Sequence, residues 1–205
     1  MAKFAIETQS AETLEYVRRM AILAEYHDKE VKHHIERIRG YTEIIAHGLN
    51  LPYEEVEIMS VASMLHDIGK ISIPVGLQVK VDKFDPFEWE IIMKHPVIGA
   101  DILHDSDSPY LQTGELIALT HHERWDGSGY PGSLREQDIP LGGRICAVAD
   151  VFDALTTPRP YRKEIPVNDA LGLIQKSAGT LFDPDVAKSF HRFFGDVLNI
   201  RRLNT

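Results

Sequence analysis

The adjacent pair His66-Asp67 limits the possible folds of this chain more than any other feature. One short stretch offers an imidazole nitrogen and a carboxylate oxygen, a donor mixture that suits Fe²⁺, Mn²⁺, Ni²⁺ or Zn²⁺. Further residues of the same kind stand far apart along the chain: His34, His95, His121-His122 and Asp150. A fold that uses them together must therefore bring distant segments to one point.

Asp150 supports a shared site because it lies within an apolar stretch, between Ala149 and Val151. A buried carboxylate is costly unless it binds a metal or pairs with a charge. A buried polar network is the alternative for the whole set, and we expect a metal centre instead. Glu30 precedes His34 by four residues and shares its helix face, so it could hold a further ion or be a solvated glutamate.

Helical spacing of apolar residues predicts an all-α fold without strands. The expected helices cover residues 11–25, 29–47, 52–65, 85–93, 111–122, 144–155, 167–178 and 184–198, and Pro96 begins one more. Glycine and proline interrupt this pattern at 123–143, which we expect to be a long ordered loop because it contains Trp125 and Tyr130. Residues 1–27 are expected to be an N-terminal helix or linker remnant, and residues 28–200 the main domain.

Composition excludes some classes of function. The formal charge of −9 argues against polynucleotide binding driven by phosphate neutralisation. A small anionic substrate stays possible, because bound divalent ions would reverse the local field. The single cysteine, Cys146, excludes an internal disulfide. With neither a membrane-length apolar run nor a secretory signal, we expect a cytoplasmic protein.

Several motifs stand out beyond the single residues. They are His34-Ile-Glu-Arg37, His66-Asp-Ile-Gly-Lys70, His95-Pro96, His121-His-Glu-Arg-Trp-Asp-Gly-Ser-Gly-Tyr-Pro131, and Asp150-Val-Phe-Asp-Ala-Leu-Thr156 followed by Arg159-Pro-Tyr-Arg162. Together they resemble the HD-GYP subgroup of the HD phosphohydrolase superfamily. The similarity extends over residues 28–190, and the string around Gly-Tyr-Pro is its most specific part.

The resemblance implies an HD-domain helical bundle that hydrolyses cyclic di-GMP, a bacterial second messenger, at a centre of two or three metal ions, often iron. It implies that Asp67 bridges ions. The other ligands would be His34, His66 and Asp150 for one position, and His95, His121 and His122 for its neighbour. Members with a third ion have an acidic ligand one helical turn before the first histidine, where this chain has Glu30.

The expected reaction begins with a water held between two ions, whose pKa falls towards neutrality. The resulting hydroxide would attack phosphorus and give linear pGpG, and a second cleavage would give GMP. Lys70 would act in catalysis and hold a phosphate as a point charge. Arg159 and Arg162 could bind a second phosphate or a guanine edge, and Tyr130 could form the pocket wall.

Other functions stay open. Cyclic GMP-AMP or another nucleotide could be the substrate, and a sensor module with little turnover is a different class of protein. The resemblance also implies contacts between the Gly-Tyr-Pro loop and GGDEF-domain cyclases. The sequence departs from the family's pattern after that tripeptide, where a common glycine moves forward to Gly132 and Ser133 follows. Family domains are often fused to sensory domains, so we expect a stand-alone protein or an excised domain.

Overall fold

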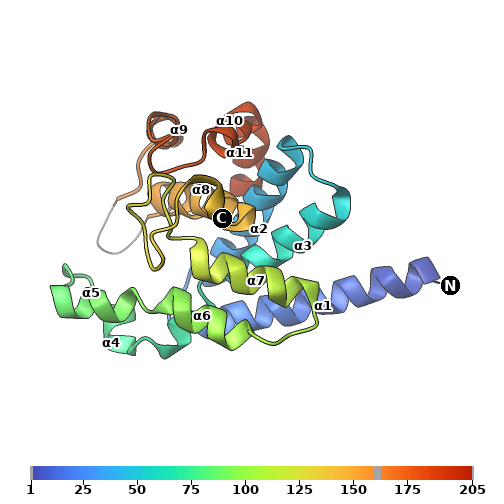
Figure 1. Cartoon of the computed structure of the whole chain (residues 1–205), viewed down its shortest axis with the longest axis horizontal. Coiled ribbons are helices and arrows are strands. Elements are labelled where there is room, and N and C mark those ends of the chain that lie inside the picture. Colours follow the sequence, from blue (N-terminus) through green and yellow to red (C-terminus); the bar gives the residue numbers. More distant parts are fainter. Residues whose placement is uncertain (1, 159–162, 205) are drawn as a thin grey trace.

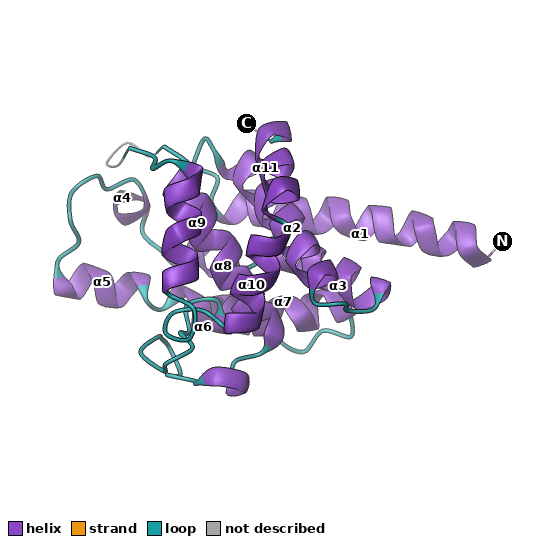
Figure 2. Ribbon diagram, turned by 90° about the horizontal axis from the view of Figure 1, so that it is seen from above, coloured by secondary structure: helices purple, strands orange, loops and turns teal. Residues whose placement is uncertain are grey.

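The computed structural model describes residues 2–158 and 163–204, with side chains from residue 11 onward. Within these ranges every named element is a helix (Figures 1 and 2), which confirms the predicted all-α fold. In chain order the elements are α1 (Ala2–Ala24), α2 (Val31–Gly48), α3 (Tyr53–Ser63), η1 (Ile68–Ser72), α4 (Val75–Gln78), α5 (Pro86–Ile92), α6 (His95–Leu103), α7 (Pro109–Thr120), η2 (Glu136–Asp138), α8 (Leu141–Thr156), α9 (Val167–Lys176), α10 (Pro184–Arg192) and α11 (Phe194–Leu203), where η marks a 3-10 helix.

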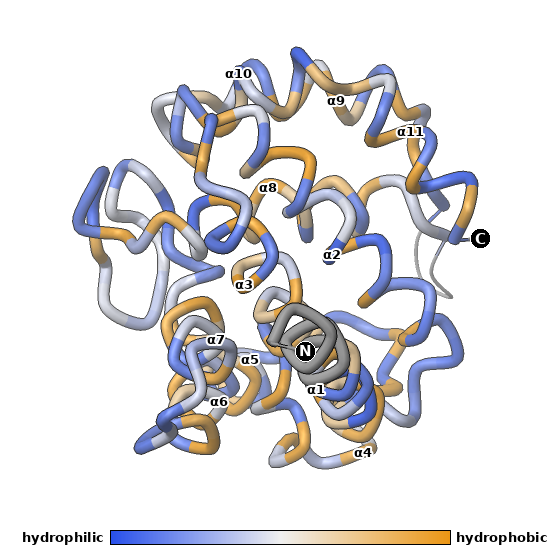
Figure 3. Tube along the Cα trace, turned by 90° about the vertical axis from the view of Figure 1, so that its right-hand side faces the viewer, coloured by the Kyte–Doolittle hydropathy of each residue, from blue (hydrophilic) through white to orange (hydrophobic). Residues whose placement is uncertain are grey.

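Helix α2 belongs to two hydrophobic clusters. Its first half contributes Val31 and Ile35 to a cluster with α1, α3 and α7. Its second half contributes Ile38, Tyr41 and Ile45 to a cluster with α8, α9, α10 and α11. Figure 3 shows α2 and α8 between α1 on one side and the layer of α9, α10 and α11 on the other. The helix that presents His34 is therefore fixed from both sides.

Helix α1 has two parts with different surroundings. Its N-terminal part extends away from the rest of the molecule (Figure 1). Its C-terminal part packs against the domain through Val17, Ala21 and Ala24, all buried. The last turns of the segment that precedes residue 28 are thus part of the folded core. Among the described residues, no helix combines the length and the apolar character that a membrane span requires.

The loop between α7 and α8 is held by specific hydrogen bonds. The buried carboxylate of Glu123 accepts from the backbone N–H groups of Gly132 (2.6 Å) and Leu134 (3.1 Å). The N–H of Trp125 donates to the carbonyl of Leu181 at 3.2 Å, which ties the loop to the segment before α10. A Gly/Pro-rich stretch is therefore able to place Tyr130 at a fixed position.

Candidate metal centre

The first group of donor atoms comes from four residues in three segments. Asp67 precedes η1, His95 begins α6, and His121 and His122 follow α7. One donor atom from each lies within 4.8 Å of the others. The Oδ1 atom of Asp67 is 3.2 Å from Nε2 of His95 and 3.7 Å from Nε2 of His121. These four predicted ligands therefore lie together.

The second group joins His34 of α2, His66 and Asp150 of α8, again within 4.8 Å. Nε2 of His66 is 3.1 Å from Oδ2 of Asp67 and 4.0 Å from Oδ1 of Asp150. The two oxygens of Asp67 therefore face different groups. This is the arrangement that a bridging carboxylate requires.

A close approach of two helices brings Asp67 to His95. A Cβ atom at Gly69 would collide with the backbone carbonyl of His95, and its next neighbour would be the backbone nitrogen of Gly99 at 2.6 Å. Only glycine lets η1 pack so closely on α6. The Gly in His66-Asp-Ile-Gly-Lys70 thus has a packing role that positions ligands.

Three histidine rings have their Nδ1 atoms directed at backbone carbonyls. The acceptors are Ser63 O for His66 (2.9 Å), Ile92 O for His95 (2.7 Å) and Ala118 O for His121 (2.9 Å). Nδ1 must carry the proton to donate to a carbonyl, which leaves a lone pair on Nε2. The carbonyls thus fix the tautomer that binds a metal through Nε2.

The metal-facing atoms lack partners of their own. Nε2 of His66 and Oδ1 of Asp67 are buried and have no hydrogen-bond partner within the described part of the chain. The Nε2 atoms of His95 and His121 face each other at 3.4 Å. Two lone pairs this close repel, and buried polar atoms without partners are costly. Divalent cations would satisfy these atoms, so the residues fit a metal centre.

The electrostatics of the site also suit cations. Burial lowers the pKa of His122 to about 3, with help from the neighbouring His95, and burial likewise lowers the pKa of His121. Both histidines are therefore neutral, as ligands must be. At His66, burial acts in the same direction, but Asp67 outweighs it and raises the pKa to about 9. His66 therefore carries a proton on Nε2 that a bound cation would replace, because the surrounding carboxylates favour positive charge there.

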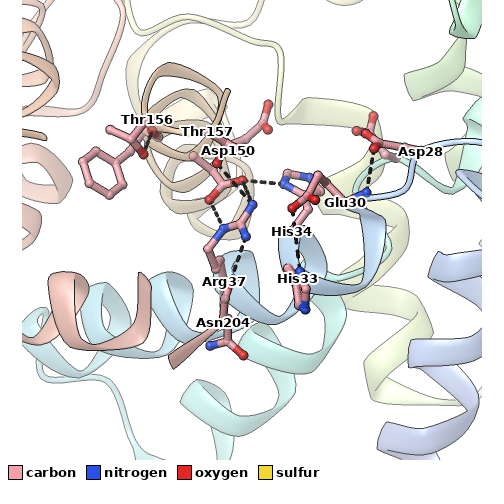
Figure 4. Close-up of polar contacts among 12 residues, drawn as sticks. Asp28, Glu30, His33, His34, Arg37, Asp150, Thr156, Thr157 and Asn204 are labelled. Carbon is pink, nitrogen blue, oxygen red and sulfur yellow. Dashed lines mark hydrogen bonds and ion pairs between the residues drawn. The ribbon is translucent and has the colours of Figure 1, made fainter. Parts of the chain in front are cut away.

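Asp153 orients His34 and escaped the sequence analysis. Nδ1 of His34 lies 2.8 Å from Oδ2 of Asp153, and Nε of Arg37 donates to its Oδ1 at 2.6 Å. Figure 4 shows His34 and Arg37 pointing towards the same face of α8. Burial opposes ionisation, yet hydrogen bonds from His34 and Arg37 lower the pKa of Asp153 to about 2. The sequence did contain a signal for the role of Asp153, because it lies about one helical turn after the predicted ligand Asp150.

Glu25 is the second residue that sequence reasoning missed. Nζ of Lys70 lies 2.5 Å from Oδ2 of Asp67 and 2.8 Å from Oε2 of Glu25. Donor atoms of Glu25, His34 and Asp67 form a third group within 4.8 Å. Burial opposes the charge of Lys70, but the two carboxylates outweigh it and raise its pKa. Glu25 directly follows α1, in the segment expected to precede the domain.

Glu30, the predicted ligand of a third ion, lies outside all three groups of the described residues. It occupies the N-cap position of α2, where its N–H donates to Asp28 Oδ1 at 2.8 Å. Its half-exposed carboxylate is 3.7 Å from Nδ1 of His33. Figure 4 marks this ion pair with a dashed line. The Glu30 carboxylate therefore contacts His33, which is not one of the predicted ligands.

A cavity of about 680 Å³ opens onto the site. Its lining includes His34, Asp67, Lys70, His122 and Asp150. It also includes Tyr130, whose ring stacks on His122 with 4.8 Å between centroids. Of the predicted substrate contacts, Lys70 and Tyr130 are therefore at the cavity, whereas Arg159 and Arg162 lie outside the described residues.

The fold and the site together define a class: an all-helical domain with two His/carboxylate groups, both faced by one aspartate, Asp67. The chain belongs to the HD domain family, whose model matches residues 18–186. The resemblance to the HD-GYP subgroup is confirmed by the curated relatives that the chain matches.

The curated relatives are named as cyclic-dinucleotide phosphodiesterases. Over 181 residues the chain is 42% identical to a cyclic di-GMP phosphodiesterase of Thermotoga maritima, covering 88% of this chain and 49% of the relative. It is 43% identical over 179 residues to the cyclic di-GMP phosphodiesterase response regulator RpfG of Xanthomonas campestris pv. campestris, covering 87% and 47%. It is 37% identical to 3'3'-cGAMP-specific phosphodiesterase 2 of Vibrio cholerae, covering 91% and 36%. The chain thus spans half or less of the length of these relatives.

Solved structures share the fold. The chain superposes on Bd1817, a "HDG"Y"P" protein of Bdellovibrio bacteriovorus, with a TM-score of 0.64 and 22% identity, covering 80% of this chain and 52% of the other. It superposes on a cyclic GMP-AMP-specific phosphodiesterase of Vibrio cholerae with a TM-score of 0.67 and 18% identity, covering 94% and 53%. At these identities the likeness concerns the fold alone.

Proposed function

We propose that this chain is a metal-dependent phosphodiesterase that hydrolyses cyclic di-GMP to pGpG and onward to GMP. One observation carries the proposal: the two oxygens of Asp67 face two separate groups of metal-binding atoms. The cavity beside them is large enough for a nucleotide. The relatives named as cyclic di-GMP phosphodiesterases support the same substrate.

The proposed ligands are the seven residues of the two groups, with Asp67 between the ions. When bound, divalent ions supply Lewis-acid stabilisation of the phosphodiester charge and an activated water. Iron is the preferred candidate, with manganese, nickel and zinc as alternatives, because imidazole and carboxylate donors without thiolates suit these metals. Lys70 would place its ammonium against a substrate phosphate, and Tyr130 would close the cavity wall beside His122.

The third ion stays a prediction, and metal content tests it. Glu30 lines the cavity but contributes to none of the donor groups of the described residues. If Glu30 holds an ion, Glu30→Ala should lower the metal content of the purified protein by one ion per chain. Unchanged content would show that Glu30 is a solvated glutamate and not a ligand.

Cyclic GMP-AMP is the second candidate substrate, because several relatives are named as phosphodiesterases specific for it.

Two further proposals concern the location of the protein in the cell and its protein partner. We propose a cytoplasmic location, where cyclic dinucleotides act, and a contact between the Gly-Tyr-Pro loop and GGDEF-domain proteins.

The deciding experiment is anaerobic incubation of Fe²⁺- or Mn²⁺-loaded protein with cyclic di-GMP, followed by chromatography of pGpG and GMP. Cyclic GMP-AMP is tested in parallel. Asp67→Ala should abolish turnover, whereas the control His104→Ala should not, because His104 is exposed and bonds to Glu115. Metal-loaded protein that cleaves neither dinucleotide would overturn the proposal.

A further inference from the structure

A row of aromatic rings leads from the metal ligands along the cavity. Tyr130 stacks on His122, and Trp89 meets Tyr130 edge-on, with 6.4 Å between centroids and 73° between planes. Phe84 is stacked with Trp89 at 6.2 Å and 29°. Phe84, Trp89 and Tyr130 all line the cavity that contains the metal-binding residues. The row therefore belongs to the same site and extends it outward.

We propose that Trp89, backed by Phe84, is the platform on which a purine base of the substrate stacks. The inference rests on the proposed function, since it identifies the part of the cavity that would hold the base. An indole face is a strong and sequence-tolerant stacking surface for nucleobases. In the row of rings, Tyr130 lies between Trp89 and the predicted ligand His122. In a nucleotide, one ribose lies between the base and the phosphate. A base stacked on Trp89 would therefore leave its phosphate near the metal-binding residues.

The surroundings of Trp89 match the chemistry of a base. Besides these rings, the cavity lining includes five aliphatic side chains, Ile73, Leu77, Val79, Val81 and Ile92, the last on the same helix as Trp89. Charged and imidazole groups around Asp67 also line the cavity. The cavity thus offers polar groups suited to a phosphodiester together with aromatic and aliphatic side chains suited to a flat base.

Trp89 is available for a ligand because its ring is not packed into the hydrophobic core. Its side chain is 43% exposed, and it belongs to neither hydrophobic cluster of the described residues. Phe87, on the same helix, is 71% exposed. Phe87 is absent from the cavity lining as far as the structure describes it, so the two rings differ in their access to the site.

The platform is held in place before any ligand arrives. A reciprocal capping box links Asp85 and Glu88 at the start of α5, with both hydrogen bonds at 2.9 Å. The N–H of Trp89 donates to the carbonyl of Asp85 at 2.9 Å. Lys80 also donates to Glu88 at 2.6 Å, which ties α5 to the preceding segment. Such preorganisation lowers the entropic cost of binding.

Steady-state kinetics of the Mn²⁺-loaded enzyme with cyclic di-GMP provide the first test. Because base–aromatic stacking contributes ~1–3 kcal/mol per base, Trp89→Ala should raise KM by about 5- to 140-fold with a smaller change in kcat. Trp89→Phe should recover most of the loss, and Phe87→Ala should behave like the wild type. Unchanged KM in folded Trp89→Ala protein would overturn the platform while leaving the phosphodiesterase intact.

Fluorescence provides a test that does not depend on turnover. GMP, which the proposed reaction yields and does not cleave, should quench the tryptophan emission of the Mn²⁺-loaded protein in a saturable manner, and the quench should vanish in Trp89→Phe, which keeps a ring for packing. A quench that persists in Trp89→Phe, or is absent from the wild type, overturns the inference. A Trp89-dependent quench in a protein that cleaves no cyclic dinucleotide would support the platform and reject only the proposed function.

Discussion

At position 133 the backbone adopts φ of +52°, and the residue there is serine. This is where the sequence departs from the glycine common in the family. A residue with a Cβ atom in the left-handed region is strained by ~1–2 kcal/mol. The departure therefore has a cost in stability, partly offset by a hydrogen bond from Ser133 Oγ to the carbonyl of Gly129 at 3.3 Å.

Replacing Ser133 should accordingly stabilise the protein. We expect Ser133→Gly to raise the free energy of unfolding by about 0.5–1 kcal/mol, after the entropy that glycine adds to the unfolded chain is subtracted. Urea unfolding measures the change. Ser128→Gly is the matched control: Ser128 lies in the same loop and is not among its positive-φ residues, so that variant should be neutral or destabilised. Equal effects of both variants would contradict the strain argument.

A second prediction at the scale of single residues concerns Glu25, which accepts a hydrogen bond from Lys70. Glu25→Gln removes one of the two carboxylates that hold the ammonium, so kcat/KM for cyclic di-GMP should fall about tenfold, the size expected for a charged hydrogen bond. Metal content should stay the same, because Lys70 is the partner of Glu25. A loss of one ion would instead make Glu25 a ligand. Glu12→Gln, on the exposed side of α1, serves as the control.

At the scale of helices, the spacing of apolar residues and the positions of glycine and proline predicted most elements. Asp85-Pro86 and Pro184 mark helix starts that the structure confirms. The predicted helix 184–198 is wrong in one respect, because Phe193 divides it into α10 and α11. The short helices η1, α4 and η2 also escaped prediction. They are too short for a periodic pattern, and tertiary contacts decide their conformation.

The close contact between η1 and α6 leads to a testable prediction at the scale of helices. Gly69→Ala should destabilise the protein by about 1–3 kcal/mol, because the added methyl group meets the His95 carbonyl. The displaced His95 should also lower metal content. Gly76→Ala in α4 is the control, since a Cβ there meets nothing within 4 Å among the described residues. Normal stability and metal content in Gly69→Ala would show that the helices can separate without consequence.

The candidate site was predictable to the extent that residue chemistry reveals it. His66-Asp67 and Asp150 in an apolar helix indicated ligands because few other roles justify burying such groups. Glu25 and Asp153 were not predictable, because their roles arise from contacts with Lys70 and His34 that only the tertiary structure creates. Trp89 carried no signal either, since an aromatic residue in a short helix usually indicates packing.

At the scale of the whole molecule, Asp153 joins α8 to α2 and, through Arg37, to the carbonyl of Asn204. Its folded-state pKa of about 2 lies below the usual value, so the ionised form stabilises the native state. This contribution, about 2 kcal/mol, is present above pH ~5 and is lost as the pH falls through the folded-state pKa. Acid should therefore loosen the connection between the two helices.

Urea unfolding of metal-free wild type and Asp153→Asn tests this at several pH values. Asparagine cannot ionise, so the wild type should be more stable by about 2 kcal/mol at pH 7, and the difference should shrink towards zero near pH 2. A difference that does not vary with pH would mean that packing, and not charge, accounts for the role of Asp153.

The spread of the ligands along the chain has one further consequence. His34, His66 and Asp150 form one group although they come from distant segments. Because the chain has a single cysteine, no internal disulfide can link these segments. A cation held by these residues would act as a cross-link that closes long loops, and closing loops restricts the unfolded ensemble. Chelation would then resemble reduction of a disulfide: metal supply would govern how long the folded protein persists as well as whether it turns over substrate.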